Sequence, residues 1–282
     1  MPVPGPLVST QWLADHLGGE SLVVLDATVL SVEGGGHVSG DEEYLVHGHV
    51  PGAYSADLIE EFSDPDAALT FTRPSREQFE RVAGEHGISN ETTVIVYDTA
   101  TGQWASRLWW LLRSFGHDDV AVLDGGLTQW RHAGRELETG YTAPVARTFV
   151  AQERPELWAD KREIEEVLAG ERVGALVCAV PAKEFSGEAP VRRRAGYIPG
   201  SVSVPARSLV DPETRRLLAP GLLAERLEPV PSGDRVILYC AAGIAATETA
   251  LALTLLGHTD LAVYDGSLNE WSADPDAALI VA

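Results

Sequence analysis

The segment Val236-Ile-Leu-Tyr-Cys240-Ala-Ala-Gly-Ile-Ala-Ala-Thr247 contains the strongest structural signal in the chain. Its first four residues are apolar or aromatic, which predicts a buried strand of a parallel sheet. From about Ala245 onward good helix formers predominate, and Gly257 is a natural stop for a helix. The segment therefore predicts a strand and a helix joined by a short turn, with Cys240 at the corner.

This position of Cys240 predicts a reactive thiol. A sulfur at such a corner faces the amide N–H groups of the turn and of the first helical turn, and these groups favour an anion. The competing interpretation is an inert cysteine, since free Cys is among the most buried residue types. We predict that Cys240 is the catalytic nucleophile. The main-chain cradle for its negative charge is predicted to consist of Ala241, Ala242, Gly243, Ile244, Ala245 and Ala246.

The composition limits the classes of function. The chain has 282 residues, of which 45% are hydrophobic and 22% charged, as expected for a globular protein. It contains 21 Lys and Arg against 42 Asp and Glu, which gives a formal net charge of −21. This charge argues against nucleic acid and against a membrane surface as partners.

The cysteines and the termini indicate the compartment. Cys178 and Cys240 are the two cysteines of the chain, so the sequence contains no disulfide framework. The first residues, Met1-Pro-Val-Pro-Gly-Pro6, do not have the pattern of a signal peptide, and no apolar run is long enough for a membrane span. We therefore expect a reduced, cytoplasmic protein.

The chain contains a diverged internal repeat. Val94-Ile-Val-Tyr-Asp98 in the first half matches Val236-Ile-Leu-Tyr-Cys240 in the second, and a helical stretch, a Gly-His pair and another apolar strand follow each. The spacing from the Gly-His pair to the next Asp is the same in both copies, since Gly116 to Asp124 and Gly257 to Asp265 are both eight positions. Such self-similarity indicates two copies of one structural unit. The first copy has Asp98 where the second has its cysteine.

Strands that alternate with helices predict an α/β fold with two domains, each a parallel sheet flanked by helices on both faces. We expect a non-catalytic domain over residues 1–140, a linker over 141–156 and a catalytic domain over 157–282. The linker is placed where Gly140, Pro144 and Pro155 lie among polar residues with weak periodicity. Both Asp98 and Cys240 are expected at the carboxyl ends of strands, where ligands of open α/β sheets bind.

Two chemistries use a cysteine at this kind of corner. Phosphatases and arsenate reductases hold an oxyanion with an Arg six positions after the cysteine, because an Arg fork matches the oxygens. Position 246 is Ala, and no Arg lies between Cys240 and Gly257. The sequence therefore favours the other chemistry, sulfur transfer through a cysteine persulfide.

Motifs in both halves resemble the tandem-domain rhodanese family of thiosulfate and 3-mercaptopyruvate sulfurtransferases. The resemblance spans nearly the whole chain, and the matching segments include Gly48-His-Val-Pro-Gly-Ala53, Ala105-Ser-Arg-Leu-Trp-Trp110, Val122-Leu-Asp-Gly-Gly126, Gly196-Tyr-Ile-Pro-Gly200, Tyr239-Cys240 and Tyr264-Asp-Gly-Ser267. The resemblance implies two rhodanese-like domains, of which the second is catalytic, and neither a metal nor an organic cofactor. It also implies a small-molecule sulfur donor, and a thiol, cyanide or a thioredoxin-like protein as acceptor.

The turn after Cys240 departs from the family pattern. Thiosulfate-type members resemble Cys-Arg-Lys-Gly-Val-Thr, and mercaptopyruvate-type members resemble Cys-Gly-Ser-Gly-Val-Thr. This chain has Ala241, Ala242 and Ala245 at the polar positions. Because the turn lacks cations, we favour a carboxylate donor over thiosulfate. The same losses leave open a second hypothesis, a rhodanese-like binding or scaffold protein with weak or no activity.

A basic segment could supply the missing positive charge. Arg192, Arg193 and Arg194 precede the Tyr-Ile-Pro-Gly motif, and an Arg fork suits a substrate carboxylate. The alternative is a solvated basic loop on an acidic surface, and the sequence leaves both open. His49, His117 and His258 do not have the spacing of metal ligands, so no metal site is predicted.

Overall fold

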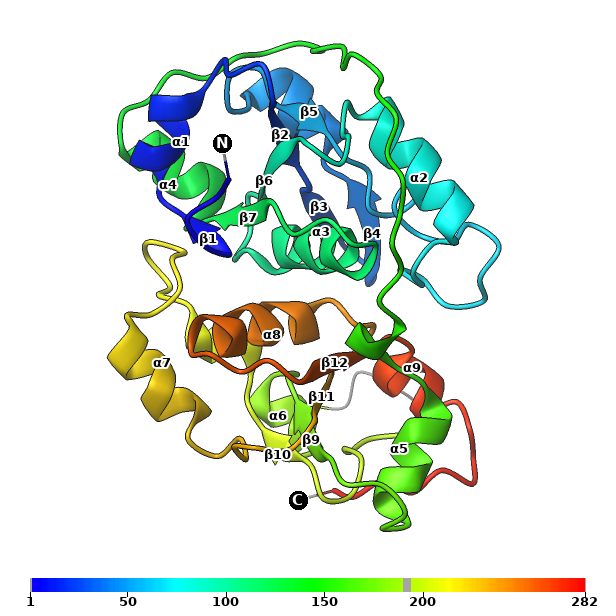
Figure 1. Cartoon of the computed structure of the whole chain (residues 1–282). Helices are drawn as coiled ribbons and strands as arrows, with labels where there is room; N and C mark the ends of the chain where they lie inside the picture. Colours follow the sequence, from blue (N-terminus) through cyan, green and yellow to red (C-terminus); the bar gives the residue numbers. More distant parts are fainter. Residues whose placement is uncertain (1, 190–193, 282) are drawn as a thin grey trace. The chain divides into compact units, whose positions relative to one another are not determined.

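The computed structural model describes residues 2–189 and 194–281. The chain divides into two compact units (Figure 1): unit 1 comprises Met1–Ala67, Arg73–Arg154 and Pro212–Arg216, and unit 2 comprises Ala68–Thr72, Pro155–Asp211 and Leu217–Ala282. The main division falls between Arg154 and Pro155, near the end of the segment predicted as the linker. Residues 141–154 cluster with unit 1, and the exchange of two short segments between the units has no signal in the sequence.

Unit 1 alternates strands and helices along the sequence. Its elements are β1 (Leu7–Val8), α1 (Thr10–His16), β2 (Leu22–Asp26), β3 (Val29–Val32), β4 (Gly36–Ser39), the π-helical turn Glu43–His47, β5 (Tyr54–Ser55), α2 (Arg76–Glu85), β6 (Thr93–Tyr97), α3 (Gln103–Ser114), β7 (Val120–Leu123) and α4 (Gly126–His132). Its main sheet has the order β1-β7-β6-β2-β5, and every pair in it is parallel.

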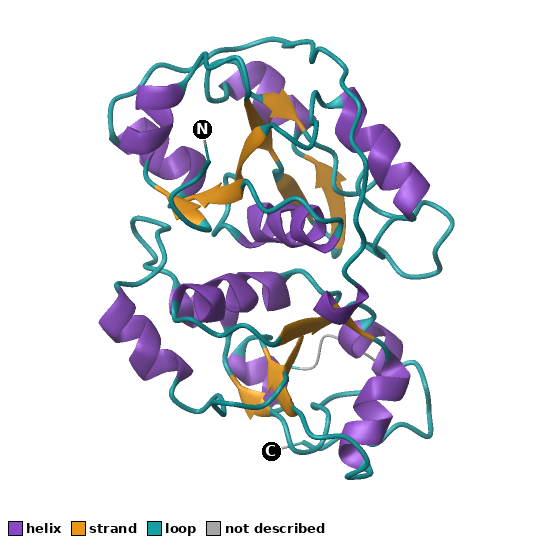
Figure 2. Ribbon diagram, viewed as in Figure 1, coloured by secondary structure: helices purple, strands orange, loops and turns teal. Residues whose placement is uncertain are grey.

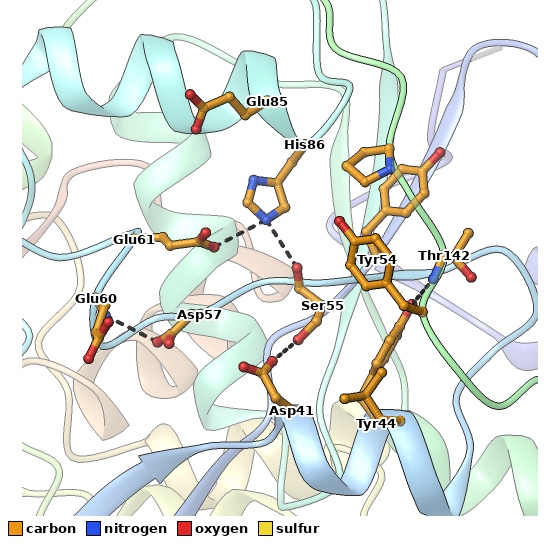
Figure 3. Close-up of a pocket in the computed structure, with 13 residues that line it drawn as sticks. Asp41, Tyr44, Tyr54, Ser55, Asp57, Glu60, Glu61, Glu85, His86 and Thr142 are labelled. Carbon is orange, nitrogen blue, oxygen red and sulfur yellow. Dashed lines mark hydrogen bonds and ion pairs between the residues drawn. The ribbon is translucent and has the colours of Figure 1, made fainter.

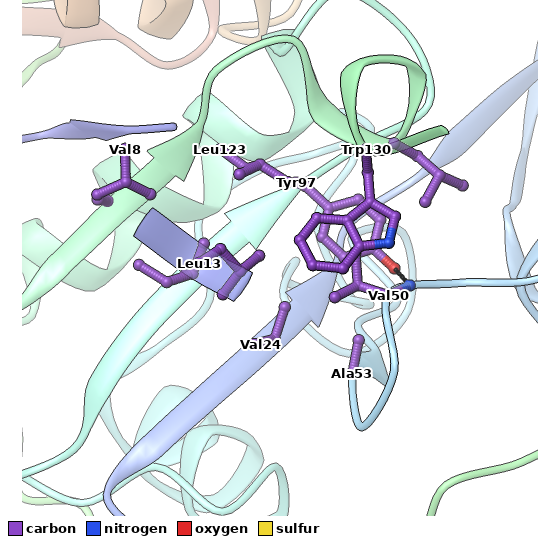
Figure 4. Close-up of a cluster of buried hydrophobic side chains, with 11 residues drawn as sticks. Val8, Leu13, Val24, Val50, Ala53, Tyr97, Leu123 and Trp130 are labelled. Carbon is purple, nitrogen blue, oxygen red and sulfur yellow. Dashed lines mark hydrogen bonds between the residues drawn. The ribbon is translucent and has the colours of Figure 1, made fainter. Parts of the chain in front are cut away.

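The two faces of this sheet are covered by different helices. A buried cluster on one face joins α1 and α4 to the sheet through Leu13, Val24, Tyr97, Leu123 and Trp130 (Figure 4). Helices α2 and α3 lie on the opposite face (Figure 1), and α3 packs on β6 and β7. Alternate residues of each strand thus enter two cores, which explains why strands such as β6 are buried throughout.

An antiparallel hairpin interrupts the parallel pattern of unit 1. Strands β3 and β4 pair from Val29 with Ser39 to Val32 with Gly36, outside the main sheet. The connecting residues Gly34 and Gly35 both have positive φ angles, which glycine adopts without steric cost. The hairpin was not predicted, because its strands are short and partly exposed.

Unit 2 repeats the arrangement. Its elements are the 3-10 turn Pro155–Leu157, β8 (Trp158–Ala159), α5 (Lys161–Leu168), β9 (Ala175–Cys178), α6 (Ala182–Phe185), β10 (Val202–Ser203), the 3-10 turn Ala206–Leu209, α7 (Pro220–Leu227), β11 (Val236–Tyr239), α8 (Ala245–Leu255), β12 (Leu261–Tyr264) and α9 (Ser267–Trp271). The strand order β10-β9-β11-β12-β8 is again parallel throughout.

Helix α8 packs on β11 and β12, while α5 and α9 lie on the other side of this sheet (Figure 2). The predicted α/β fold with two parallel sheets is therefore confirmed. Strand β11, which precedes Cys240, lies in the middle of its sheet between β9 and β12. Within the described residues, no helix combines the length and the apolar character needed to cross a membrane.

Candidate active site

Cys240 lies at the predicted corner. Strand β11 ends at Tyr239, the turn covers residues 240–244, and α8 begins at Ala245. The Cys240 residue is 2% exposed, whereas Ala241, Ala242 and Ala245 on the rim of the turn are half-buried. The strand, the turn and the helix thus hold the sulfur just beneath the surface at the carboxyl end of the sheet.

The hydroxyl of Ser267 organises the turn. Its Oγ accepts hydrogen bonds from the N–H groups of Cys240 at 3.2 Å and Gly243 at 3.0 Å. The same Oγ donates to the main-chain oxygen of Tyr264 at 2.8 Å. Gly243 was predicted to offer its N–H to the anion at the sulfur, but that N–H bonds to Ser267 instead.

Ser267 adopts an unusual backbone conformation. Its φ angle is +49°, in the left-handed region that a residue with a side chain rarely occupies. The side chain is completely buried, so its three hydrogen bonds are shielded from water. The sequence indicated only a turn at Asp265-Gly-Ser267. The sequence did contain a signal for an unusual backbone conformation at position 267, since the first copy of the repeat has Gly126 at the equivalent position.

The other N–H groups of the turn and of the start of α8 differ from that of Gly243. Among the described residues, the N–H groups of Ala242, Ile244 and Ala246 have no hydrogen-bond partner, and the same holds for Ala241 and Ala245. Buried N–H groups are normally bonded, so such a group of donors is suited to an anion. The helix dipole of α8 adds to this preference.

The equivalent turn of unit 1 is filled by its own carboxylate. Asp98 follows β6, and its Oδ1 accepts from the N–H groups of Ala100 at 2.8 Å and Gly102 at 3.0 Å. Its Oδ2 accepts from the N–H groups of Trp104 and Ala105, both at 3.0 Å. Unit 1 therefore has a main-chain anion site in the same place, and Asp98 occupies it.

The charge state of Asp98 follows from these contacts. Burial raises the pKa of Asp98 above its ordinary value, and the four N–H groups oppose that rise. Since each oxygen receives two N–H donors, a proton on either oxygen would face a donor. The ionised carboxylate is thus the form that satisfies all four groups.

Neighbouring strands place a second pair of equivalent residues beside the two corners. Asp26 on β2 pairs with Tyr97, and Cys178 on β9 pairs with Tyr239. Burial raises the pKa of Asp26 to about 6 and that of the Cys178 thiol to about 12. Cys178 is fully buried and stays a neutral thiol at physiological pH, which argues against Cys178 as a nucleophile.

The structure describes one of the three arginines that were predicted to bind the substrate carboxylate. Arg192 and Arg193 lie outside the described residues. The guanidinium of Arg194 donates to the main-chain oxygens of Asp274 and Ala277, the latter at 2.6 Å. Arg194 thereby fastens the segment after α9, and its role in substrate binding stays a prediction.

A cavity of about 490 Å³ in unit 1 is a separate feature (Figure 3). Its lining includes Asp41, Asp57, Glu61 and His86, and contains none of the predicted site residues. Both ring nitrogens of His86 face oxygen atoms, of Val82 on one side and of Ser55 and Glu61 on the other. Several carboxylates around this cavity disfavour an anionic ligand. No group of three or more His, Cys, Asp or Glu within the described ranges is arranged to hold a metal ion.

Comparison with known proteins identifies the fold and the family. The model of the rhodanese-like domain matches residues 9–133 and 162–274. The 3-mercaptopyruvate sulfurtransferase of Escherichia coli K12 is 34% identical, over 95% of this chain and 95% of the relative. The thiosulfate sulfurtransferase of Rattus norvegicus is also 34% identical, over 94% of this chain and 91% of the relative.

Among solved structures, SseA from Escherichia coli, described as a 3-mercaptopyruvate sulfotransferase with the rhodanese fold, superposes with a TM-score of 0.83. It is 30% identical, and the alignment covers 93% of this chain and 98% of that structure. The two matches of the domain model fall in the two halves of the internal repeat. The chain therefore belongs to the rhodanese family.

Proposed function

We propose that this rhodanese is a sulfurtransferase that carries a sulfane sulfur as a persulfide on Cys240. The observation that carries the proposal is the group of main-chain N–H donors around the turn of Cys240, of which Ala242, Ile244 and Ala246 lack acceptors among the described residues. A persulfide is an anion at neutral pH, and main-chain dipoles stabilise an anion without help from side chains.

The loading step follows from the chemistry of a thiolate. With thiosulfate, the Cys240 thiolate attacks the outer sulfur, a new S–S bond forms, and sulfite leaves with the electron pair of the broken S–S bond. With 3-mercaptopyruvate, the C–S bond breaks, the carbon takes the electron pair, and the thiol proton moves to that carbon to give pyruvate. Both routes leave the same negatively charged persulfide on the enzyme.

The repeat supports a narrower proposal for the cradle than the sequence alone. The N–H groups that hold the Asp98 carboxylate belong to residues 100, 102, 104 and 105, and their counterparts are 242, 244, 246 and 247. The N–H of Thr247 donates to the main-chain oxygen of Ile244 at 3.0 Å. We therefore assign the persulfide to the N–H groups of Ala242, Ile244 and Ala246, with Gly243 held by Ser267.

The donor is inferred from what the turn lacks. Ala241 and Ala242 offer no cation for the sulfonate end of thiosulfate, so we propose 3-mercaptopyruvate as the better donor. Arg192 and Arg193 remain the candidates for its carboxylate. Because Arg194 bonds to two main-chain oxygens, its replacement by Ala should lower stability more than it changes the KM for the donor. A thiol, cyanide or a thioredoxin-like protein is the proposed acceptor.

The test is cyanolysis with each donor in turn. Thiocyanate formation should require Cys240, so Cys240→Ser should show no more than the background rate with either donor. The matched control is Cys178→Ser, since Cys178 is the other thiol of the chain and lies on the adjacent strand. This variant should keep the wild-type rate.

Two outcomes would contradict the proposal. Thiocyanate formation at the background rate by both wild type and Cys240→Ser, with either donor, would mean that the chain is a binding or scaffold protein in spite of its family. Loss of activity in Cys178→Ser but not in Cys240→Ser would mean that Cys178, and not Cys240, is the nucleophile. A ratio of kcat/KM that favours thiosulfate would contradict the donor assignment alone.

A further inference from the structure

We propose that His86 is a pH-dependent latch in unit 1. As an imidazolium, it fastens residues 55–63, here called the wall segment, to the end of α2. Loss of its proton releases the wall segment and opens the cavity of about 490 Å³ that this segment borders. The proposal concerns unit 1 alone and does not depend on sulfur transfer by Cys240.

The imidazole ring of His86 is enclosed by oxygen acceptors. Its Nδ1 lies 2.8 Å from the main-chain oxygen of Val82. Its Nε2 lies 3.0 Å from the main-chain oxygen of Ser55 and 3.3 Å from a carboxylate oxygen of Glu61 (Figure 3). A main-chain oxygen can only accept a hydrogen bond, so each ring nitrogen needs a proton to bond to its neighbour. Because the residue is only 7% exposed, the imidazolium is the form that satisfies both nitrogens.

The charges around the ring favour the same form. His86 follows the last residue of α2, where the carbonyl end of the helix dipole favours a cation. Within the described lining of the cavity, His86 is the one basic side chain, and Arg81 nearby on α2 is bonded to Glu85 at 2.9 Å. Glu61 is the carboxylate in contact with the ring. The other titratable side chains of the lining are Asp41, Tyr44, Tyr54, Asp57, Glu60, Glu85 and Tyr141.

The balance between burial and these contacts supports a protonated ring near neutral pH. Burial alone would lower the pKa of His86, because it disfavours the charged form. The hydrogen bonds to Glu61, Val82 and Ser55, together with the charge of Glu61, outweigh burial and raise the pKa of His86 above its ordinary value of 6.5. The proton is therefore lost above that pH.

The wall segment has two attachments to α2, and one of them does not titrate. The first is the ring of His86, through Ser55 and Glu61. The second is the side-chain amide of Gln78, whose Nε2 donates to the main-chain oxygens of Glu61 at 2.9 Å and Ser63 at 2.7 Å. The chain thus contains its own control for a latch that depends on a proton.

Loss of the proton breaks the first attachment in either tautomer. A neutral imidazole has a single N–H, and its other nitrogen presents a lone pair. With the proton on Nδ1, the ring stays bonded to Val82, and its lone pair faces the oxygens of Ser55 and Glu61. With the proton on Nε2, the lone pair faces the oxygen of Val82, and the ring is no longer bonded to the helix. In both forms the ring ceases to join α2 to the wall segment.

The first experiment measures the protonation of His86 in the full chain. In 15N NMR spectra of the histidine-labelled protein, the titration midpoint of His86 should lie above 6.5. It should also lie above the midpoints of His37 and His117, because burial lowers the pKa of both. The variant His86→Gln assigns the signal. A midpoint at or below 6.5 would overturn the proposal.

The second experiment measures release of the wall segment by hydrogen exchange. The N–H groups of Ala56 and Phe62 donate to the main-chain oxygens of Asp26 at 2.9 Å and Asp57 at 3.0 Å, so their exchange reports opening. Their protection, corrected for the intrinsic exchange rate, should fall several-fold in wild type between pH 6.5 and pH 9. The midpoint of this fall should coincide with the titration midpoint of His86.

Two variants are matched controls for the exchange experiment. In His86→Gln the protection of the wall segment should not change with pH over this range, because a side-chain amide does not titrate. In Gln78→Ala the protection should be lower than in wild type at every pH, but its pH profile should be the same. Parallel profiles of wild type and His86→Gln would overturn the latch.

Glu61→Gln provides a second test that does not depend on the folding of His86→Gln. This change removes the carboxylate charge beside the ring and nearly preserves the shape of the side chain. The titration midpoint of His86 and the pH of release should both move to lower pH, by the same amount. Movement of one without the other would contradict the link between the proton and the wall segment. Because no readout involves Cys240, failure of the proposed function would leave the latch intact.

Discussion

The corner at Asp98 and the corner at Cys240 have the same construction and opposite contents. Each follows a central strand, has a five-residue turn and leads into a long buried helix. At the first corner a carboxylate accepts four main-chain N–H groups, and at the second the equivalent donors are largely without acceptors among the described residues. The comparison shows that a main-chain anion site belongs to the fold, whereas its availability depends on one side chain.

The turns also differ in how they are held. The left-handed residue is Gly102 in the first turn and Gly243 in the second, one position earlier in the repeat. At Gly126 an added Cβ would lie 2.2 Å from the main-chain oxygen of Asp98, whereas Ser267 has a Cβ at the equivalent position. Unit 2 thus accommodates a hydroxyl that fastens the turn of Cys240, in place of the carboxylate that fastens the turn of Asp98.

Replacement of Ser267 should have the largest effect, because its hydroxyl holds the turn of Cys240 as the Asp98 carboxylate holds the turn of unit 1. Ser267→Ala leaves the N–H groups of Cys240 and Gly243 buried without an acceptor, which should cost about 2–5 kcal/mol of unfolding free energy. The same change should lower kcat at least ~10-fold with either donor, because the N–H groups that face the persulfide lose their positions. Steady-state kinetics and urea unfolding measure the two effects.

The control for this variant is Ser208→Ala, which removes a hydroxyl that donates to the main-chain oxygen of Pro205 in the same unit. It should leave kcat within about twofold of wild type, since among the described residues no hydrogen bond joins Ser208 to the turn of Cys240. Loss of stability in Ser267→Ala with an unchanged kcat would mean that Ser267 supports the fold and does not position the site.

A second difference between the units should be visible in their pH dependence. Burial raises the pKa of Asp26 to about 6 from an ordinary value of 3.8, so the folded state holds its proton to higher pH than the unfolded state. The resulting stabilisation is complete below the unfolded pKa and is lost as the pH rises through about 6. Between pH 4.5 and 7.5, wild type should lose about 2 kcal/mol relative to Asp26→Asn, measured by urea unfolding.

The counterpart of Asp26 in unit 2 supplies the control. Because burial raises the pKa of the Cys178 thiol to about 12, this thiol stays protonated in that whole range. The difference in stability between wild type and Cys178→Ser should therefore not change from pH 4.5 to 7.5. A parallel pH profile for wild type and Asp26→Asn would contradict the buried carboxyl at the first corner.

A third comparison concerns two equivalent tyrosines, one in each unit. The hydroxyl of Tyr97 accepts from the N–H of Val50, and that of Tyr239 accepts from the N–H of Ile198, both at 3.1 Å. Replacement of either by Phe should cost about 1–3 kcal/mol of unfolding free energy. The loss for Tyr97→Phe should grow above pH 6, because this hydroxyl also bonds to Asp26.

The loss for Tyr239→Phe should not depend on pH, since the Tyr239 hydroxyl donates to Ser201 at 2.7 Å. Urea unfolding of both variants at pH 5 and 8 checks this difference. If the two variants respond to pH alike, the hydrogen bond between Tyr97 and Asp26 does not contribute as described.

Much of the fold and the position of the nucleophile could be predicted from the sequence. The apolar run before Cys240, the helix formers after Ala245 and the spacing of the repeat each determine local structure through a few neighbouring residues. Confirmation of the strand, the turn and the α8 start at Ala245 shows that these signals agree with the tertiary structure.

The fastening of the two turns could not be predicted in the same way. Ser267 is 27 positions from Cys240 in sequence, and its hydroxyl reaches the turn only because β11 and β12 are adjacent. The carboxylate of Asp98 turns back onto four N–H groups of its own loop, whereas the sequence indicated only that a thiol is missing there. The arginines show a similar limit, since Arg194 finds its partners more than 70 residues away.

The most direct test of the account is a crystal structure of the protein after incubation with 3-mercaptopyruvate. We expect this structure to show an additional sulfur atom on Sγ of Cys240, within hydrogen-bond distance of the N–H groups of Ala242, Ile244 and Ala246. Ser267 should still be bonded to Gly243. An unmodified Cys240, or an additional sulfur that points away from these N–H groups, would contradict the claim that the main chain of this turn holds the persulfide.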